Sequence, residues 1–249
     1  MMNKFMKYSK SFSTVLCKVT KYVIFMDLVL LSSLVCAQEQ YEDEDIDAQE
    51  VNNGILHYFD FTLNPSFPFN TFNEKYIGSP FGFSVAYLKQ RKLGRMDFLG
   101  AQFSYAHLGS MTTAFNQFDI RTGTNWINLQ FMYRHFPDFY FWKIEPFVEA
   151  SFGPQWMYTL TTSTLYEDGT TDFNMEESDF ALTYAIGLGF TFYIANGFTI
   201  ISKVNLTSST ALTYSIPGEN LGGFPIENFE TETSSLNYIQ LQLGISYVF

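Results

Sequence analysis

The chain has 249 residues, of which 47% are hydrophobic, 19% aromatic and only 16% charged, with a formal net charge of −11. The acidic balance argues against nucleic acid as a partner, and the low charged fraction with many aromatic residues excludes a disordered chain or a coiled coil. No uninterrupted apolar run of 18 residues occurs beyond the N-terminus, which excludes a polytopic helical membrane protein.

Residues 1–37 have the pattern of a cleaved signal peptide. An apolar stretch over 22–35, interrupted by Asp27, ends in Val35-Cys36-Ala37, with small residues at the positions that a signal peptidase reads. A transmembrane anchor is the main alternative, but the stretch is short and contains an acid. The basic residues that precede it, with no acid among them, are Lys4, Lys7, Lys10, Lys18 and Lys21.

The two cysteines, Cys17 and Cys36, both lie inside this leader. A lipoprotein signal at Cys36 is a second alternative, although a small residue directly before this cysteine is missing. After cleavage the mature chain would contain no cysteine, so we expect neither disulfides nor thiolate chemistry. Residues 38–53 follow as an acidic segment without apolar periodicity, which we expect to be a disordered periplasmic tail.

From residue 54 onward the hydrophobic period is two, which indicates β-strands. The last segment shows it clearly, because Ile239, Leu241, Leu243, Ile245, Tyr247 and Phe249 fall on one face. Residues 180–194 alternate in the same way. The pattern predicts eight strands, over 54–64, 80–90, 96–108, 124–136, 142–158, 179–194, 197–214 and 235–249. The side of 96–108 that faces inward is ambiguous, because Asp97 and Leu99 share a face.

The connections between these strands alternate between long and short. This alternation is typical of an all-β, eight-stranded antiparallel up-and-down transmembrane β-barrel, here over 54–249, with long external loops and short periplasmic turns. Asn196-Gly197 is the strongest hairpin signal. We therefore expect 109–123, 159–178 and 215–234 to face outward, and 91–95, 137–141 and 195–196 to face the periplasm.

Alternation alone also fits a soluble, lipocalin-like barrel, so the composition of the polar face has to decide. Along 180–194 this face carries Ala, Thr, Gly and Tyr with no charge, whereas a solvated face would be rich in Lys, Glu, Asp and Arg. Small residues suit the crowded interior of an eight-stranded barrel, and large apolar residues suit a lipid-facing band. Aromatic residues near the strand ends, 139–142 at one rim and Trp156 and Tyr158 at the other, fit interfacial girdles.

A small, balanced set of charges is predicted to face the lumen. Charges buried in a narrow lumen are costly unless they are paired, so three charges of each sign indicate an ion-paired plug. Arg134 and Glu145 flank the 137–141 turn and could pair across neighbouring strands. The predicted lumen charges are Asp60, Arg134, Lys143, Glu145, Glu149 and Lys203.

The end of the chain, Leu243-Gly244-Ile245-Ser246-Tyr247-Val248-Phe249, resembles the last strand of the small OmpX-like and PorT-like outer-membrane β-barrels. The segment 144–154, with Pro146-Phe147-Val148, is similar to another strand of that family. The resemblance covers 54–249 and implies residence in the outer membrane of a Gram-negative bacterium, among its lipids and lipopolysaccharide. It also implies that Tyr247 and Phe249 form the signal presented to the barrel-assembly machinery.

Signatures of catalysis are missing from the sequence. There is no phosphate loop, CxxC or HExxH, and the three histidines, His57, His107 and His135, lie far apart and are expected to face lipid or the interface. His107 and Ser110 lie at the depth used by lipid-modifying barrel enzymes, but the surrounding residues do not match the His-x-Ser-Asn pattern. We therefore expect no enzyme, no metal site and no cofactor.

The loops suggest electrostatic partners. Loops 159–178 and 215–234 are acidic without a base, so divalent cations could bridge them to lipopolysaccharide phosphates. No EF-hand spacing occurs, however, and a solvated acidic surface is the favoured interpretation. The turn 91–95 is basic and could pair with the acidic tail, or both could be solvated independently. The sequence thus favours a non-enzymatic, plugged barrel in an envelope-structural, adhesion or secretion-accessory role. The alternatives are a small-solute pore, a lipid-modifying enzyme and a soluble periplasmic ligand-binding barrel.

Overall fold

The computed structural model divides the chain into two units, Met1–Gly54 and Ile55–Phe249, and the second is an all-β barrel. The signal peptide and acidic tail expected over 1–53 lie outside the described residues. The structure describes residues 54–69, 80–114, 118–138, 143–165, 167, 171–195, 197–217 and 229–249.

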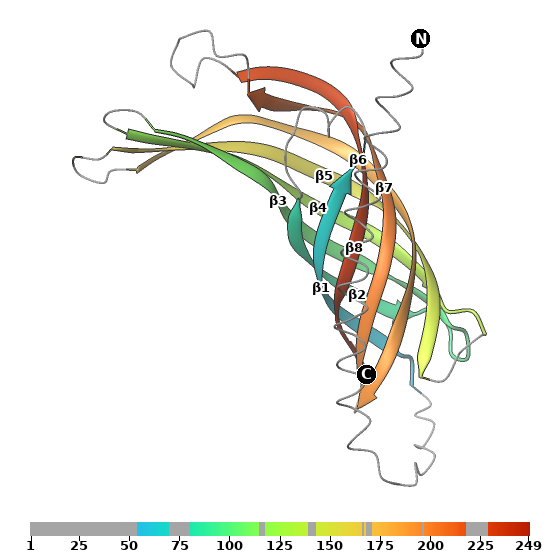
Figure 1. Ribbon diagram of the computed structural model, residues 1–249. Coiled ribbons are helices and arrows are strands. Elements are labelled where there is room, and N and C mark those ends of the chain that lie inside the picture. Colours follow the sequence, from blue (N-terminus) through green and yellow to red (C-terminus); the bar gives the residue numbers. More distant parts are fainter. Residues whose placement is uncertain are drawn as a thin grey trace, which may run out of the picture. The chain divides into compact units, whose positions relative to one another are not determined.

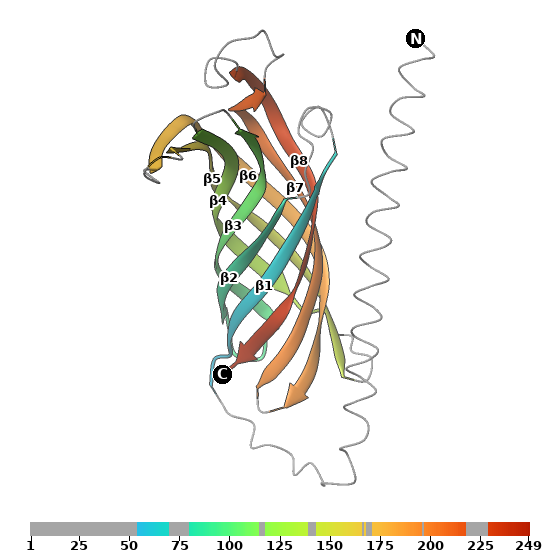
Figure 2. The ribbon, with the colours of Figure 1, turned by 60° about the vertical axis from the view of Figure 1, so that its left-hand side comes forward.

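Eight antiparallel strands form a closed ring in chain order, β1 to β8, as the sequence predicted. Closure is made by β8, which lies beside β1 in Figure 2 and pairs with it from Tyr58↔Val248 to Pro68↔Tyr238. The ring leaves no open strand edge along its wall, which a lipid environment requires. The strands are β1 His57–Pro68, β2 Phe81–Gln90, β3 Asp97–Ala114, β4 Phe118–His135, β5 Ile144–Leu165, β6 Thr171–Ala195, β7 Phe198–Pro217 and β8 Phe229–Val248.

Within the barrel wall, side chains alternate between the two faces of the sheet. Along β2 the exposed and buried residues follow each other one by one, because successive side chains of a strand point to opposite faces. The ambiguous third strand is resolved by this rule. Phe98 and Gln102 are buried in the lumen, whereas Leu99 is exposed on the outside.

The outer face of the barrel is apolar over its whole circumference. Leu188, for example, lies between Val148 and Val204 on the two neighbouring strands, and all three are exposed. Large exposed hydrophobic side chains in such a band need a lipid solvent, which distinguishes this barrel from a soluble one. None of the described residues forms a helix long and apolar enough to cross a membrane. Other members of the band are Phe59, Phe61, Leu63, Phe83, Phe103, Leu129, Phe131, Phe152, Leu182, Ile186, Leu206 and Ile245.

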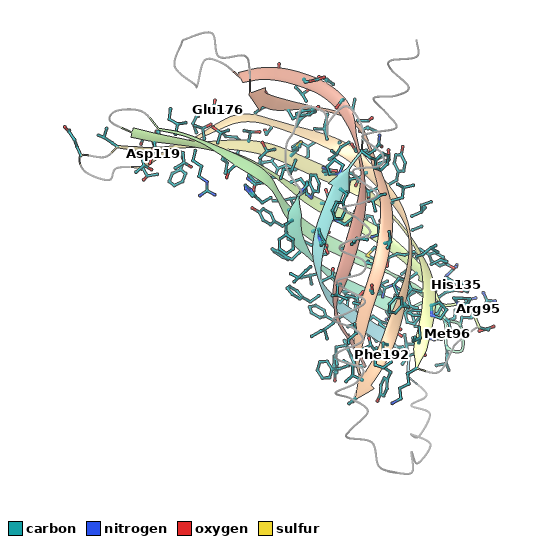
Figure 3. The ribbon with its side chains drawn as sticks, in the orientation of Figure 1. Arg95, Met96, Asp119, His135, Glu176 and Phe192 are labelled. Carbon is teal, nitrogen blue, oxygen red and sulfur yellow. The ribbon has the colours of Figure 1, made fainter. Side chains whose placement is uncertain are left out.

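The connections β2–β3, β4–β5 and β6–β7 are short and lie at one end of the barrel, which we call the turn end. The predicted tight turn lies between β6 and β7, and Gly197 adopts a φ of 82° there, a conformation that favours glycine. Figure 3 shows Arg95, Met96 and His135 together at this end. Phe249 exchanges two backbone hydrogen bonds with His57 here, of 2.8 and 3.1 Å. The chain terminus is therefore part of the junction between β1 and β8, which we call the seam.

At the other end, the hairpin end, the strands continue well beyond the expected boundaries. Residues 159–178 were predicted as a loop, but β5 runs to Leu165 and β6 starts at Thr171; the predicted loops 109–123 and 215–234 likewise contain long strand extensions. Register shifts occur where the strands leave the barrel, at His107/Gly109, at Thr159/Leu160 and at Ser208/Ala211. Such bulges bend strands.

The extensions of β3 to β6 form a four-stranded sheet that turns away from the barrel to one side, at the upper left of Figure 1, while β7 and β8 continue as a separate hairpin. We call it the protruding sheet and define it as residues 109–114, 118–124, 159–165 and 171–177.

Candidate functional site

Four of the predicted lumen charges meet inside the barrel near the turn end. Arg134 donates from Nη2 to Asp60 Oδ2 at 2.7 Å and to Glu149 Oε2 at 2.8 Å, and from Nε to the same Glu149 oxygen at 3.0 Å. Lys203 donates from Nζ to Glu149 Oε1 at 2.6 Å. All four side chains are buried, and their charges balance. We call this group the lumen charge cluster.

Two further predicted lumen charges, Lys143 and Glu145, are not members of this cluster. Glu145 is exposed at the turn end, so the expected Arg134–Glu145 pair is wrong. Arg134 reaches Glu149 instead because these two residues are direct cross-strand partners of β4 and β5. Lys143 is half-buried and lies just before β5.

An aromatic ring supports one side of the cluster. The guanidinium carbon of Arg134 lies 4.5 Å from the centroid of the Phe147 ring, which gives a cation–π contact in a dry environment. This ring needs the space left by Gly189, because a Cβ atom there would come within 2.4 Å of Phe147 Cζ. The small residues of β6, predicted to line the lumen, therefore give room to large side chains from neighbouring strands.

A chain of neutral polar side chains continues from the cluster along the lumen. Lys203 also donates to Gln102 Oε1 at 3.2 Å, Gln102 donates to Ser104, and Ser104 and Ser84 share a hydrogen bond of 2.7 Å. Ser84 in turn bonds to Asn64. The sequence did not single out the neutral residues of this chain, although each lies at an inward position of the period-two pattern. Further polar members, equally buried, are Thr62, Ser66, Gln240 and Gln242.

Apolar clusters close the lumen on both sides of this polar layer. At the turn end, Phe136 folds inward after β4 and packs on Tyr58, Phe98 and Phe147 with ring centroids 5.4–5.6 Å apart. At the hairpin end, Trp126 stacks on Tyr238 across the barrel at 4.9 Å. Both layers consist of buried side chains, so side chains occupy the lumen at these two levels and at the polar layer between them.

The histidines lie apart from one another. His57 stacks on Phe249 at the seam, His135 bonds to Asp97 at 2.7 Å near the turn end, and His107 bonds to Asn125 at 2.9 Å near the hairpin end. Ser110, the proposed partner of His107, instead accepts a 3.4 Å bond from Arg121. Among the described residues no group of three or more His, Cys, Asp or Glu side chains is placed to hold a metal ion.

The predicted assembly signal lies in an aromatic cluster at the seam. Tyr247 packs against Phe198 at 4.8 Å and against Phe249 at 5.6 Å, and all three side chains are exposed on the outer face. These rings are thus accessible to a membrane-embedded partner.

One edge of the protruding sheet is formed by β6, and the other by β3, whose pairing with β2 in the described strands ends at Phe81↔His107. Within the described strands, β6 pairs with β7 only from Thr183↔Ser209 to the turn end, whereas its pairing with β5 continues to Thr164↔Thr171. Beyond Thr183 the link to β7 is made by side chains. Asp179 Oδ2 accepts from the Thr213 backbone nitrogen at 2.7 Å, and the Leu182 nitrogen donates to Thr210 Oγ1 at 3.0 Å. The strand segment 171–178 therefore lies at an edge of the sheet.

Sequence reasoning assigned this edge to an acidic loop because acidic residues dominate it. A period-two signal was nevertheless present, since Asp172, Asn174 and Glu176 alternate with Phe173 and Met175. Of the predicted loop 215–234, the first residues belong to β7, which ends at Pro217, and the last belong to β8, which starts at Phe229. Residues 218–228 lie outside the described residues. The interaction expected between the basic turn 91–95 and the acidic tail also lies outside them.

These features together define the class of protein: a small outer-membrane β-barrel of eight strands, with a lipid-facing exterior and a filled lumen. Proteins of this class reside in the outer membrane of Gram-negative bacteria, as predicted.

Comparison with known proteins gives likeness in fold and no closer relation. No protein family and no curated protein matches the chain. Solved structures that resemble it include Neisserial surface protein A, with 10% identity, a TM-score of 0.39 and coverage of 78% of this chain and 96% of that one. A major outer membrane protein from Thermus thermophilus has 12% identity and a TM-score of 0.43, and the match covers 79% of this chain and 100% of that one. Ail, the attachment invasion locus protein of Yersinia pestis, solved in complex with the heparin analogue sucrose octasulfate, has 11% identity and a TM-score of 0.40. That match covers 78% of this chain and 97% of that one.

Proposed function

We propose that this protein is a non-enzymatic outer-membrane anchor whose closed barrel presents the protruding sheet for binding a partner outside the cell, an adhesion-type role. The observation that carries the proposal is the edge of β6, where the ladder to β7 stops at Thr183 while β5 and β6 continue to Thr164↔Thr171. A filled lumen explains why the extended strands, and not the interior, would carry the function.

The orientation follows from how much chain leaves the barrel wall at each end, because 109–124 and 159–177 at the hairpin end, strand extensions included, are longer than 91–96 and 136–143 at the turn end. Outer-membrane barrels have short periplasmic turns and longer extracellular connections. The hairpin end, with the protruding sheet, is therefore the extracellular end, and the turn end with the chain terminus is periplasmic. In that orientation the β6 edge is exposed to other cells, surfaces and secreted proteins.

The chemistry of the edge indicates what it would bind. An exposed strand edge offers a row of backbone donors and acceptors to an extended peptide, which adds as a further strand. The edge segment 171–179 contains Asp172, Glu176, Glu177 and Asp179 and no basic residue. We therefore expect a cationic, extended segment as the partner.

A peptide-binding experiment tests this proposal. The protein in lipid nanodiscs is titrated with a fluorescent peptide of alternating Lys and Val, and with a control peptide in which two Val are replaced by Pro. Only the first can form a continuous ladder, so we expect it alone to bind. The variant Asp172→Asn/Glu176→Gln/Glu177→Gln keeps the backbone edge and should weaken binding about tenfold, because it removes three charges. Equal binding of both peptides would contradict the proposal.

The rival function is a pore for small solutes. Buried ion pairs and two apolar layers disfavour a continuous water path, so we expect no channel-like conductance in planar bilayers containing the purified protein. Stable unitary currents would show that the lumen opens and would favour the pore.

The resemblance of the last strand to OmpX-like and PorT-like barrels supports two finer proposals. The barrel-assembly machinery would read Tyr247 and Phe249, and an accessory role in secretion is an alternative use of the same protruding sheet. Lipopolysaccharide and bridging divalent cations are proposed as further partners at the acidic extracellular surface.

A further inference from the structure

We infer that the protruding sheet has a membrane-docking face, which rests on the outer leaflet of the bilayer that holds the barrel. The starting observation is the exposure of two apolar residues on the sheet. The Phe173 side chain is 76% exposed and Met175 is 48% exposed, although both lie beyond the barrel on a segment rich in acids.

Strand register shows that both residues belong to the face that continues the lipid-facing surface. On the barrel wall, Trp156 of β5 and Phe180 of β6 are cross-strand partners on the outside, with rings stacked 5.9 Å apart. The bulge at Thr159/Leu160 inserts one extra residue into β6, so the outward positions of β6 change from even to odd numbers there. Met175 and Phe173 therefore point to the same side as the lipid-facing aromatic residues.

The direction of the bend brings this face toward the membrane. Figure 1 shows β3 to β6 turning outward, away from the barrel, after they leave its wall. When a wall bends outward, its outer surface becomes the surface that looks back toward the membrane plane. The opposite surface, which continues the lumen side, then looks away from the cell.

The two faces differ in charge, because the docking face carries one charge of each sign, Arg121 and Asp119, whereas the acids of β6 lie on the opposite face. Arg121, Thr162 and Phe173 form one cross-strand row on the docking face, since Arg121 is the partner of Thr162 and Thr162 is the partner of Phe173. Glu176 lies on the opposite face, where it accepts a 3.0 Å hydrogen bond from Asn174.

Asp119 lies one row further out on the docking face, at the far end of the sheet from the barrel (Figure 3). An exposed arginine next to exposed apolar side chains is the combination that binds the phosphate and acyl-chain boundary of a lipid leaflet.

Neighbouring positions on β5 provide a matched test. Thr162 lies on the docking face and Ser163 on the opposite face, and both are half-buried. In the full chain with Cys17→Ser and Cys36→Ser, Thr162→Cys or Ser163→Cys is labelled with a nitroxide and reconstituted in nanodiscs of phosphatidylcholine and phosphatidylglycerol. Electron paramagnetic resonance then measures collisions with oxygen, which concentrates in lipid, and with a water-soluble nickel chelate.

We expect the label at 162 to collide several-fold less with nickel, relative to oxygen, than the label at 163. The double change Phe173→Ser/Met175→Ser should abolish this difference, while heat-modified gel mobility shows that the barrel remains folded. Arg121→Gln should reduce the difference in the anionic discs but leave it unchanged in discs of phosphatidylcholine alone.

Two results would overturn the inference. Equal nickel accessibility at 162 and 163 would mean that the docking face is in water. Dipolar broadening of the 162 spectrum that disappears on mixing with unlabelled protein would mean that a second copy of the chain covers this face instead of lipid. Neither result bears on peptide binding at the β6 edge, which is measured separately.

Discussion

Glu149→Gln is expected to destabilise the barrel strongly, because Glu149 is the acceptor shared by both cations of the lumen charge cluster. It receives three charge-assisted hydrogen bonds of 2.6–3.0 Å, two from Arg134 and one from Lys203. The substituted glutamine would offer one neutral oxygen and leave Asp60 as the single anion for two buried cations. Breaking a buried pair in this way typically costs about 3–5 kcal/mol.

The matched control is Glu145→Gln, the same change on the same face of the same strand at an exposed position. Substitutions of this kind usually alter stability by less than about 0.5 kcal/mol. The free energy of unfolding is measured by urea titration in lipid vesicles, followed by tryptophan fluorescence. A second variant, Glu149→Gln/Lys203→Met, leaves Arg134 and Asp60 as a neutral pair and should recover more than half of the loss.

If the free energies of unfolding of Glu149→Gln and Glu145→Gln differ by less than about 1 kcal/mol, the typical cost of breaking a buried pair does not apply here. The ion pairs would then not stabilise the barrel.

Three further predictions concern the membrane, the seam and the topology. Leu188→Arg places a charge on the lipid face and should cost about 2–4 kcal/mol if the site is near the midplane; vesicle refolding yields check this, and a normal yield would contradict the lipid-facing assignment. Deletion of Phe249 removes two backbone bonds and the ring stacked on His57, so we expect little heat-modifiable barrel in outer-membrane fractions, whereas wild-type levels would argue against a role in assembly. On intact cells, Glu167→Cys should react with a bulky maleimide and Arg95→Cys should not; the reverse pattern would invert the topology.

The period-two pattern predicted much of the barrel because it is a local property of the chain. The number of strands, the position of the turn at Gly197 and the outward side of Leu188 all follow from alternation and turn residues within a few positions. Even the inward direction of Asp60, Glu149 and Lys203 could be predicted in this way, since each needs only the parity of its own strand.

Tertiary structure decided which of these residues meet. Arg134 bonds to Asp60, 74 positions away, and Glu149 bonds to Lys203, 54 positions away, because strand stagger around the closed ring sets which inward side chains share a level. The pairing expected with Glu145 failed for this reason: cross-strand register, which the sequence does not state, places Glu149 opposite Arg134. The protruding sheet has a similar origin, because the bulge at Thr159/Leu160 changes the face on which Phe173 and Met175 lie, and a single inserted residue in a ladder depends on the neighbouring strand.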